Sequence, residues 1–261
     1  MHPALYISKT GLAAQDVRLA TISNNLANAS TTGFKRDSVN FEDLLYQIQR
    51  QPGGLSSQTT QLPSGIQIGT GVRVVSTEKE FTGGSLQITD QGLDLAINSR
   101  GFFQIQLPNG ETGYTRNGAF QLNSEGQIVN SAGYLLEPNI TVPENASNLT
   151  ISIDGAVSAT IFGNPNAQQL GNIQIADFVN PAGLQSQGGN IFTPTAASGD
   201  AQTGTAGLNG LGEILQGTLE NSNVEVVEEL VNMISTQRTY EMNSKVISTV
   251  DQMLQYISQN L

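Results

Sequence analysis

Few side chains of this sequence could perform acid–base chemistry. The only histidine is His2, beside the N-terminus, so a serine–histidine–aspartate arrangement would lack a well-placed base. Adjacent carboxylates occur at Glu42-Asp43 and Glu228-Glu229, and paired carboxylates can serve as acid and base. The first pair is typical of a solvated face, and the second of a helix start, where negative charge complements the helix dipole. We therefore expect no catalytic residues and no enzymatic activity.

Cofactor and metal patterns are equally sparse. Gly69-Thr70-Gly71 is followed by Val72-Arg73-Val74 and not by the glycine that a dinucleotide-binding loop requires, and no Gly-Lys-Ser/Thr occurs. The chain has no cysteine, which excludes disulfides, thiol catalysis and cysteine zinc sites. We expect no cofactor and no bound metal.

Charge and hydropathy exclude further classes. Eleven basic residues stand against 22 acidic ones, which argues against nucleic acid as a partner, because its phosphates require a basic surface. Between Gly101 and Ser222 the only basic residue is Arg116. No apolar run approaches the roughly 18 residues of a membrane span, and the N-terminus lacks the features of a cleaved signal peptide.

The C-terminal stretch predicts a long helix. It contains no glycine or proline after Ser222, and Ser222 with Glu225 matches a capping box. We expect a helix over residues 222–261, about 55–60 Å long at about 1.5 Å per residue. Apolar residues recur along it every seven positions, as in helices that pack along one stripe: Val226, Met233, Tyr240, Ile247, Leu254 and Leu261. The companion seam is polar in its first half, at Thr236 and Asn243.

The N-terminus has a similar repeat. We expect a helix from about Ala4 to Asn28, ending in a turn-rich cluster with Gly33 as its cap. Its seven-residue stripe is Leu5, Leu12, Leu19 and Leu26. Two such seams, one at each end, predict that the termini meet each other or other copies in a coiled-coil-like layer.

The middle of the chain is predicted to be β-rich. Apolar and polar residues alternate in short segments, and hairpin turns are indicated at Pro108-Asn109-Gly110 and Asp154-Gly155. We expect an α+β fold with these parts: an N-terminal helix in 1–33, an irregular connector with short strands in 34–85, a β-rich domain of antiparallel strands in 86–184, a second connector in 185–221, and the C-terminal helix in 222–261.

Several motifs resemble those of a known family. Asn24 to Asn28 followed by Thr32 to Lys35, Leu219 to Val224, and Gln237 to Glu241 are similar to motifs of the axial proteins of the bacterial flagellum, the rod and hook family. Arg100 to Phe103 with Tyr114 to Arg116 resembles the middle domain of that family. The N-terminal motif consists of Asn24, Asn25, Leu26, Ala27, Asn28, Thr32, Gly33, Phe34 and Lys35.

A further segment resembles one subgroup of this family. Residues 46–65 are similar to a stretch that characterises distal rod members and is generally missing from hook members. Their composition alone would suggest a flexible loop. The resemblance implies instead that the segment locks neighbouring subunits and stiffens the tube, through Tyr46, Arg50, Pro52, Gly53, Leu62 and Pro63.

The resemblance implies a structural role. Copies would polymerise helically into the straight, rigid distal rod, forming part of the drive shaft and export channel. Implied partners are the chain itself, proximal rod proteins, the hook protein, the surrounding L and P ring proteins, the rod cap and the flagellar export apparatus. The implied location is the periplasmic rod of the basal body, reached by type III export without a cleaved signal peptide. The predicted subunit interface combines the two seven-residue stripes listed above, from Leu5 to Leu26 and from Val226 to Leu261.

Two alternatives stay open from the sequence. One is a proximal rod or hook protein of the same family. The other is a secreted β-rich adhesive or binding module that its terminal helices oligomerise.

Overall fold

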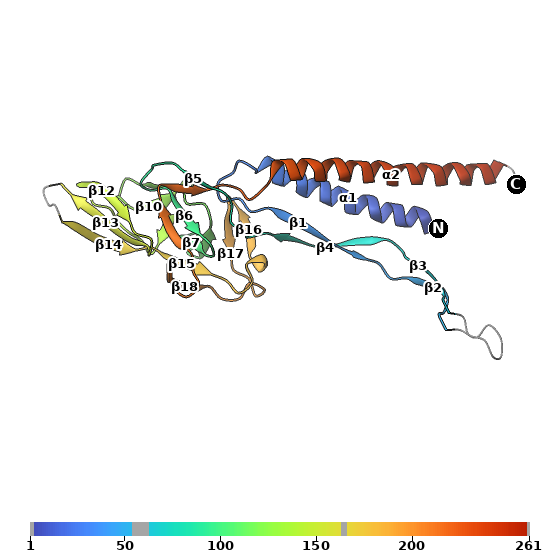
Figure 1. Cartoon of the computed structure of the whole chain (residues 1–261), viewed down its shortest axis with the longest axis horizontal. Coiled ribbons are helices and arrows are strands. Elements are labelled where there is room, and N and C mark those ends of the chain that lie inside the picture. The colour runs from blue at the N-terminus through green and yellow to red at the C-terminus, as the bar shows by residue number, and fades with distance from the viewer. Residues whose placement is uncertain (1–2, 54–62, 163–165, 260–261) are drawn as a thin grey trace. The chain divides into compact units, whose positions relative to one another are not determined.

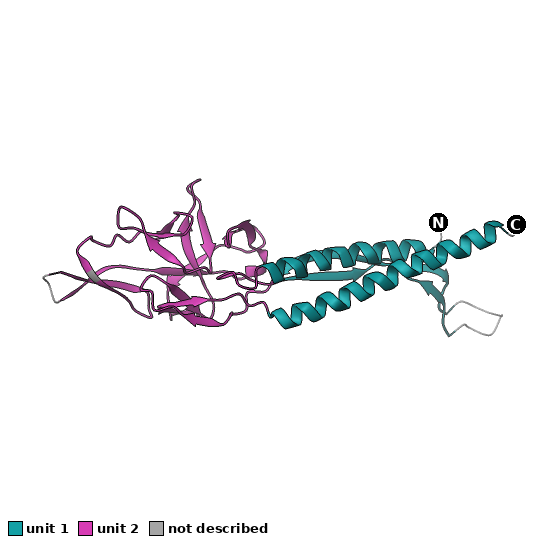
Figure 2. Ribbon diagram, turned by 90° about the horizontal axis from the view of Figure 1, so that it is seen from above, with its two compact units in different colours: residues 1–27, 37–78, 225–261 teal, residues 28–36, 79–224 magenta. Residues whose placement is uncertain are grey.

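The computed structural model describes residues 3–53, 63–162 and 166–259 (Figure 1). A long helix near each terminus flanks a β-rich region, so the expected α+β class is confirmed. The chain forms two compact units (Figure 2): unit 1 comprises residues 1–27, 37–78 and 225–261, and unit 2 comprises residues 28–36 and 79–224. Among the described residues, no helix has the length and apolar content needed to cross a membrane.

Unit 1 consists of two helices and a β-ribbon. Helices α1 (Pro3–Ala27) and α2 (Val226–Gln259) lie side by side (Figure 1). They run antiparallel, because Asn25 contacts Glu229 while Gly11 lies against Asn243. The ribbon pairs β1 (Asp37–Asp43) with β4 (Val72–Lys79), whose last residue belongs to unit 2, and β2 (Gln47–Arg50) with β3 (Ile66–Ile68).

The seam between the helices is more polar than the apolar stripes suggest. The residues of α2 that are fully buried are Glu229, Thr236 and Val250, which share a spacing of seven with the half-buried Asn243. On α1 the buried residues are Ser8, Ala14, Ile22 and Asn25. Small and polar side chains let the two backbones approach, so α2 packs on α1 mainly through the companion seam.

The predicted start of the C-terminal helix is wrong by four residues. Ser222 does not form a capping box, since its hydroxyl accepts a hydrogen bond from the N–H of Val224 at 3.2 Å. Asn223 is held in unit 2, where its amide donates to the carbonyl of Glu80 at 2.8 Å. These bonds keep the chain non-helical until Val226, and the helix is about 51 Å long.

The largest sheet of unit 2 has nine strands. Their order is β16-β17-β8-β7-β11-β10-β9, and β15 pairs with both β7 and β18. The bounds are β7 (Phe102–Gln106), β8 (Thr112–Thr115), β9 (Phe120–Leu122), β10 (Ile128–Asn130), β11 (Leu135–Glu137), β15 (Gln174–Asp177), β16 (Gln185–Gly188), β17 (Ile191–Thr193) and β18 (Gln202–Thr205).

Smaller sheets complete unit 2. One pairs β12 (Ala146–Ile151), β13 (Ala156–Ile161) and β14 (Ala167–Asn172), another pairs β6 (Leu95–Asn98) with β19 (Glu213–Gln216), and a third pairs β5 (Leu86–Ile88) with β20 (Thr218–Glu220). A short 3₁₀ helix spans Pro181–Gly183. The nine-stranded sheet, the β12–β14 sheet and the β6–β19 pair share a core of aliphatic and aromatic side chains, among them Leu95, Phe103, Ile105, Leu136, Val157, Ile175 and Ile214.

Both expected hairpin turns are present. Pro108 to Gly110 join β7 and β8, and Asp154-Gly155 join β12 and β13, with Gly110 at φ +83° and Gly155 at φ +89°. The segments expected to be irregular connectors contain more regular structure than their composition indicates. Strands β1 to β4 form the ribbon from the described parts of residues 37–79, and residues 185–220 supply β16 to β20.

A cluster of three charged side chains lies in the interior of unit 2. Lys35 Nζ lies 2.7 Å from Glu220 Oε1, and Arg116 Nε lies 3.0 Å from Glu220 Oε2. The side chains of Lys35, Glu220 and Arg116 are only 0%, 1% and 3% exposed. Glu220 also accepts a hydrogen bond from the N–H of Gly84 at 3.0 Å. One carboxylate therefore serves two cations and a backbone donor.

The burial of this cluster changes the proton affinity of its lysine. Burial lowers the pKa of Lys35 below its ordinary value of 10.5; the carboxylate of Glu220 opposes this shift, and the charge of Arg116 adds to it. Because two cations share one anion, the carboxylate is the scarcer partner. Loss of the Glu220 carboxylate should therefore lower the free energy of unfolding more than loss of the Lys35 ammonium group does.

We predict different stabilities for two substitutions in this cluster. Glu220→Gln leaves both cations buried without a counter-charge and should lower the free energy of unfolding by about 3–5 kcal/mol. Lys35→Met removes one of the two cations and should cost only about 1–2 kcal/mol, for the hydrogen bonds lost. Denaturant unfolding of both full-length variants measures the difference. Equal costs would contradict the assignment of Glu220 as the limiting partner.

The lowered pKa of Lys35 predicts a pH dependence. Between its folded-state pKa and 10.5, the unfolded chain binds more protons at this residue, so its contribution to stability rises with pH across that window and is lost as pH falls. Burial and the nearby Glu137 raise the pKa of Tyr114, which acts in the opposite sense above about 10.0. Lys35→Met retains Tyr114 and is the matched control. The stability of the wild type relative to Lys35→Met should rise toward pH 10.5; a constant difference would refute the shift.

Candidate assembly surface

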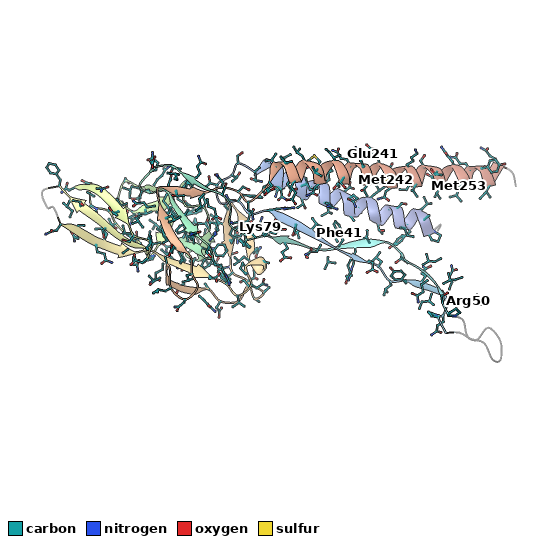
Figure 3. The ribbon with its side chains drawn as sticks, viewed as in Figure 1. Phe41, Arg50, Lys79, Glu241, Met242 and Met253 are labelled. Atoms are coloured by element: carbon teal, nitrogen blue, oxygen red, sulfur yellow. The ribbon has the colours of Figure 1, made fainter. Side chains whose placement is uncertain are left out.

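Helix α2 exposes most of its large apolar side chains. Its first half leaves Val227, Leu230, Val231 and Ile234 exposed, with Val227 75% accessible. Its second half exposes Met242, Val246, Met253, Tyr256 and Ile257. Figure 3 shows side chains standing out along this helix, with Met242 and Met253 labelled. A contiguous apolar surface of this kind marks an interaction site.

The end of α2 extends past its partner helix. In the antiparallel register Gly11 lies against Asn243, so Pro3 lies opposite a residue near Asp251. Residues 251–259 are all exposed. They include Leu254 and Ile257, which continue the seven-residue seams. Nothing in the described residues covers these side chains.

The residues predicted to form the interface occupy mixed positions. Leu5, Leu12, Leu19 and Leu26 are half-buried on α1, as are Met233 and Ile247 on α2. Val226, Tyr240 and Leu254 are exposed. Leu261 lies outside the described residues. The described residues of the two stripes therefore lie partly at the edge of the contact between the helices and partly on the exposed surface of the helix pair.

The ribbon carries a second exposed apolar region. Leu45, between β1 and β2, is 89% exposed, and Tyr46, Ile48 and Ile66 are exposed beside it. The pairing of β2 with β3 joins Gln47 to Ile68, and Arg50 to Ile66. A two-stranded ribbon without a covering layer is only marginally stable in water, and among the described residues these four side chains remain exposed.

The predicted stiffening residues lie on this ribbon. Tyr46, Arg50, Pro52, Gly53 and Pro63 are exposed, and Arg50 is labelled in Figure 3. Leu62 lies outside the described residues. The structure thus places the described residues of this group on the same ribbon arm as the exposed apolar side chains.

The first half of the N-terminal motif makes contacts inside unit 1. The amide of Asn25 is 1% exposed; it donates to the carbonyl of Asp37 at 2.8 Å and accepts from the N–H of Asp37 at 2.9 Å. It also donates to Glu229 Oε1 at 3.4 Å. Asn24 donates to the carboxylate of Asp37 at 3.4 Å. Leu26 is half-buried, while Ala27 is exposed.

The second half of the motif belongs to unit 2. Asn28 accepts from the hydroxyl of Thr31, and the carbonyl of Thr32 accepts from Asn190 at 2.8 Å. Phe34 is buried, and the ammonium of Lys79 lies 5.1 Å from the centre of its ring. The motif therefore makes its contacts with other parts of the same chain, and its buried residues do not form an open binding surface.

Gly33 has a role other than the predicted helix cap. Helix α1 ends at Ala27, six residues earlier. Gly33 has φ +69°, and a Cβ atom there would lie 2.6 Å from the backbone nitrogen of Asn117. Its N–H donates to the carbonyl of Glu220 at 2.8 Å. Glycine is required because the backbone docks closely against the β8–β9 connection.

Sequence reasoning missed Glu220 and Arg116 as functional partners of the motif. Signals for both were present: Arg116 is the only basic residue between Gly101 and Ser222, and Glu220 lies in the C-terminal motif. An isolated cation in an acidic region is a candidate for a buried ion pair, since buried charges require partners.

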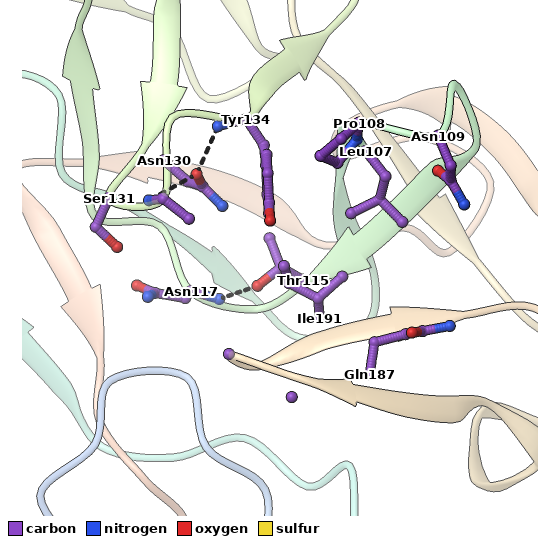
Figure 4. A pocket seen from close by; sticks show the side chains of 13 residues that line it. Leu107, Pro108, Asn109, Thr115, Asn117, Asn130, Ser131, Tyr134, Gln187 and Ile191 are labelled. Carbon is purple, nitrogen blue, oxygen red and sulfur yellow. Dashed lines mark hydrogen bonds between the residues drawn. The ribbon is translucent and has the colours of Figure 1, made fainter.

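Unit 2 also contains an uncharged pocket of about 550 Å³ (Figure 4). Its turns are fixed by short hydrogen bonds: Asn130 Oδ1 accepts from the N–H of Tyr134 at 2.9 Å, and Thr115 Oγ1 accepts from the N–H of Asn117 at 3.1 Å. The lining residues include no Asp, Glu, Lys, Arg or His. Apart from the weakly acidic hydroxyl of Tyr134, this lining offers no group for general acid–base catalysis.

Comparisons with known proteins match three parts of the chain to family models. Residues 5–35 match the flagella basal body rod protein model. Residues 96–159 match the flagellar hook protein FlgE/F/G D1 domain. Residues 215–260 match the flagellar basal body rod FlgEFG protein C-terminal model.

Full-length relatives agree with these models. The flagellar basal-body rod protein FlgG of Buchnera aphidicola subsp. Schizaphis graminum is 55% identical, over 99% of this chain and 100% of that protein. FlgG of Caulobacter vibrioides is 48% identical over 98% of both chains. FlgG of Bacillus subtilis is 35% identical over 98% of this chain and 97% of that protein. The chain therefore belongs to the FlgG family of flagellar basal-body rod proteins.

Proposed function

We propose that copies of this chain associate through the exposed apolar face of α2, including its free end at residues 251–259. As a member of the FlgG family the chain is a structural subunit of the distal rod of the flagellum. The observation that supports this interface is the burial pattern of α2: of its 34 residues only Glu229, Thr236 and Val250 are fully buried within the chain.

Burial of the exposed apolar side chains of α2 would favour association. Complete burial of a large aliphatic side chain stabilises a structure by about 1.5–3 kcal/mol of free energy. Along α2 most of these side chains are exposed in the single chain, so this free energy is available for association. A helical polymer repeats one heterologous contact without closure. Each copy would then bury the face of α2 against the helices of its neighbours. The stripe residues from Leu5 to Leu26 and from Val226 to Leu254 would lie at the margin of the same contact.

The ribbon would supply a second contact, which makes the polymer straight and stiff. In the part of the chain that the structure describes, Leu45, Tyr46, Ile48 and Ile66 are exposed, and a neighbouring chain would bury them. A contact at a ribbon arm, away from the helical seam, would resist bending because bending slides neighbouring copies past each other. The stiffening residues, including Leu62, would act through this contact.

Further proposals concern partners and location. By family, the chain would contact proximal rod proteins, the hook protein, the L and P ring proteins, the rod cap and the export apparatus. It would reach the periplasm through the flagellar type III apparatus without a cleaved signal peptide. The family is a structural one and not an enzyme family, and we propose no catalytic activity for this chain.

Charging the exposed face of α2 tests the assembly proposal. Val231→Asp introduces a carboxylate at an exposed site, so the free energy of unfolding should change by less than about 0.5 kcal/mol. Polymer formation, measured by sedimentation and electron microscopy, should be abolished. The matched control is Val179→Asp, an exposed valine of unit 2, which should assemble normally. Normal polymers from Val231→Asp would refute this interface.

Charging the ribbon tests the stiffening proposal. Leu45→Asp should leave folding unchanged, because this leucine is exposed, but the polymers formed should be shorter or more strongly curved in electron micrographs. Leu208→Asp, at an exposed leucine of unit 2, is the control and should give straight polymers. Straight polymers of normal length from both variants would exclude the ribbon as a stiffening contact.

A further inference from the structure

The ion-pair cluster of unit 2 has the geometry of a ligand site. Lys35 Nζ donates to Glu220 Oε1 at 2.7 Å and to the carbonyl of Thr82 at 2.6 Å. The lysine side chain has no exposed surface. It arrives from residues 28–36, whose neighbours on both sides in the sequence, α1 and β1, belong to unit 1. This short loop belongs to unit 2, and Lys35 is its only charged side chain that is fully buried there.

The acceptors of this site are held by groups other than the lysine. Arg116 Nη2 donates to Glu220 Oε1 at 3.3 Å, while Nε contacts Oε2 at 3.0 Å. Arg116 is itself fixed by the carbonyl of Gly101, 2.6 Å from Nη1, and by that of Ser99, 2.8 Å from Nη2. The backbone of Glu220 pairs with Leu86 of β5.

From this geometry we propose that unit 2 contains a preformed binding site for a primary alkylammonium group, which Lys35 occupies as a ligand from the same chain. The two oxygen acceptors require N–H donors on the ligand. The full burial leaves no room for methyl groups on its nitrogen. Docking of residues 28–36 is then a binding step within unit 2, and it does not depend on assembly into a polymer.

Chemical rescue of Lys35→Ala tests the site in the full-length chain. This substitution removes Cγ, Cδ, Cε and Nζ, but a free amine must keep a non-bonded distance of about 3.5–4 Å from Cβ, so methylammonium fits the space that is left. A ligand of the folded state stabilises in proportion to ln(1 + [L]/Kd), so methylammonium should raise the melting temperature saturably, by about 2–4 °C for each kcal/mol of binding free energy gained. n-Propylammonium, which is too long, and tetramethylammonium, which has no donor, should act less or not at all.

Two controls decide what the rescue means. Lys245→Ala truncates an exposed lysine and should show no response to methylammonium. Lys35→Ala combined with Glu220→Gln removes the negative charge that faces the ammonium group and should lose most of the response. Equal responses in Lys35→Ala and Lys245→Ala, equal action of the quaternary ion, or the lack of any response in folded Lys35→Ala would overturn the proposal.

A second experiment remains decisive if Lys35→Ala does not fold. The chain has no cysteine, so Lys35→Cys introduces a single thiol that can be alkylated in denaturant before refolding. With 2-bromoethylamine the thiolate forms a C–S bond and bromide leaves, which gives a primary ammonium of lysine length. This product should melt near the wild-type temperature, whereas products of iodoacetamide or (2-bromoethyl)trimethylammonium should not. Equal recovery with the trimethylated product, or no recovery with the primary amine, would refute the site.

Discussion

The buried carboxylate of Glu220 is the interaction on which the organisation of unit 2 depends. It joins the loop that carries Lys35, the end of β8 that leads to Arg116, and the backbone at Gly84. Lys35 and Glu220 are 185 residues apart in the sequence. A buried ion pair contributes little net stability, because desolvation offsets the attraction between the charges. Its effect here is geometric, since only one arrangement of the three segments satisfies every charge.

The helix pair of unit 1 has polar side chains in its seam and apolar side chains on its surface. Its seam contains Thr236 and the hydrogen bond from Asn25 to Glu229, which joins the two helices, and large apolar side chains remain outside. A helix pair with the highest stability as a monomer would bury its large apolar side chains in the seam and expose its polar side chains. The polar seam aligns the helices, while the free energy available from apolar burial is retained for contacts with other chains.

Much of this fold could be predicted from the sequence. The seven-residue repeats predicted both helices, supported at the C-terminal end by the lack of glycine after Ser222, and Asp154-Gly155 predicted a hairpin. The helix face that packs internally could not be predicted, because the pairing of Asn25 with Glu229 outweighs the apolar stripe. Strands β17, β19 and β20 were missed because their partners β8, β6 and β5 lie about 80 or more residues earlier. The exposure of the ribbon, and the partners of Lys35, likewise depend on tertiary contacts.

The dependence of unit 2 on Glu220 also constrains how the chain folds in time. Loop closure between distant segments is entropically costly, and folds dominated by such contacts form slowly. A chain that emerges with its N-terminus first presents Lys35 early, but the carboxylate that receives it follows only after β19. Until then the lysine stays hydrated and β5 lacks its partner strand. The complete unit can close only when nearly the whole chain is available, so the contacts of Glu220 are among the last contacts of unit 2 that can form.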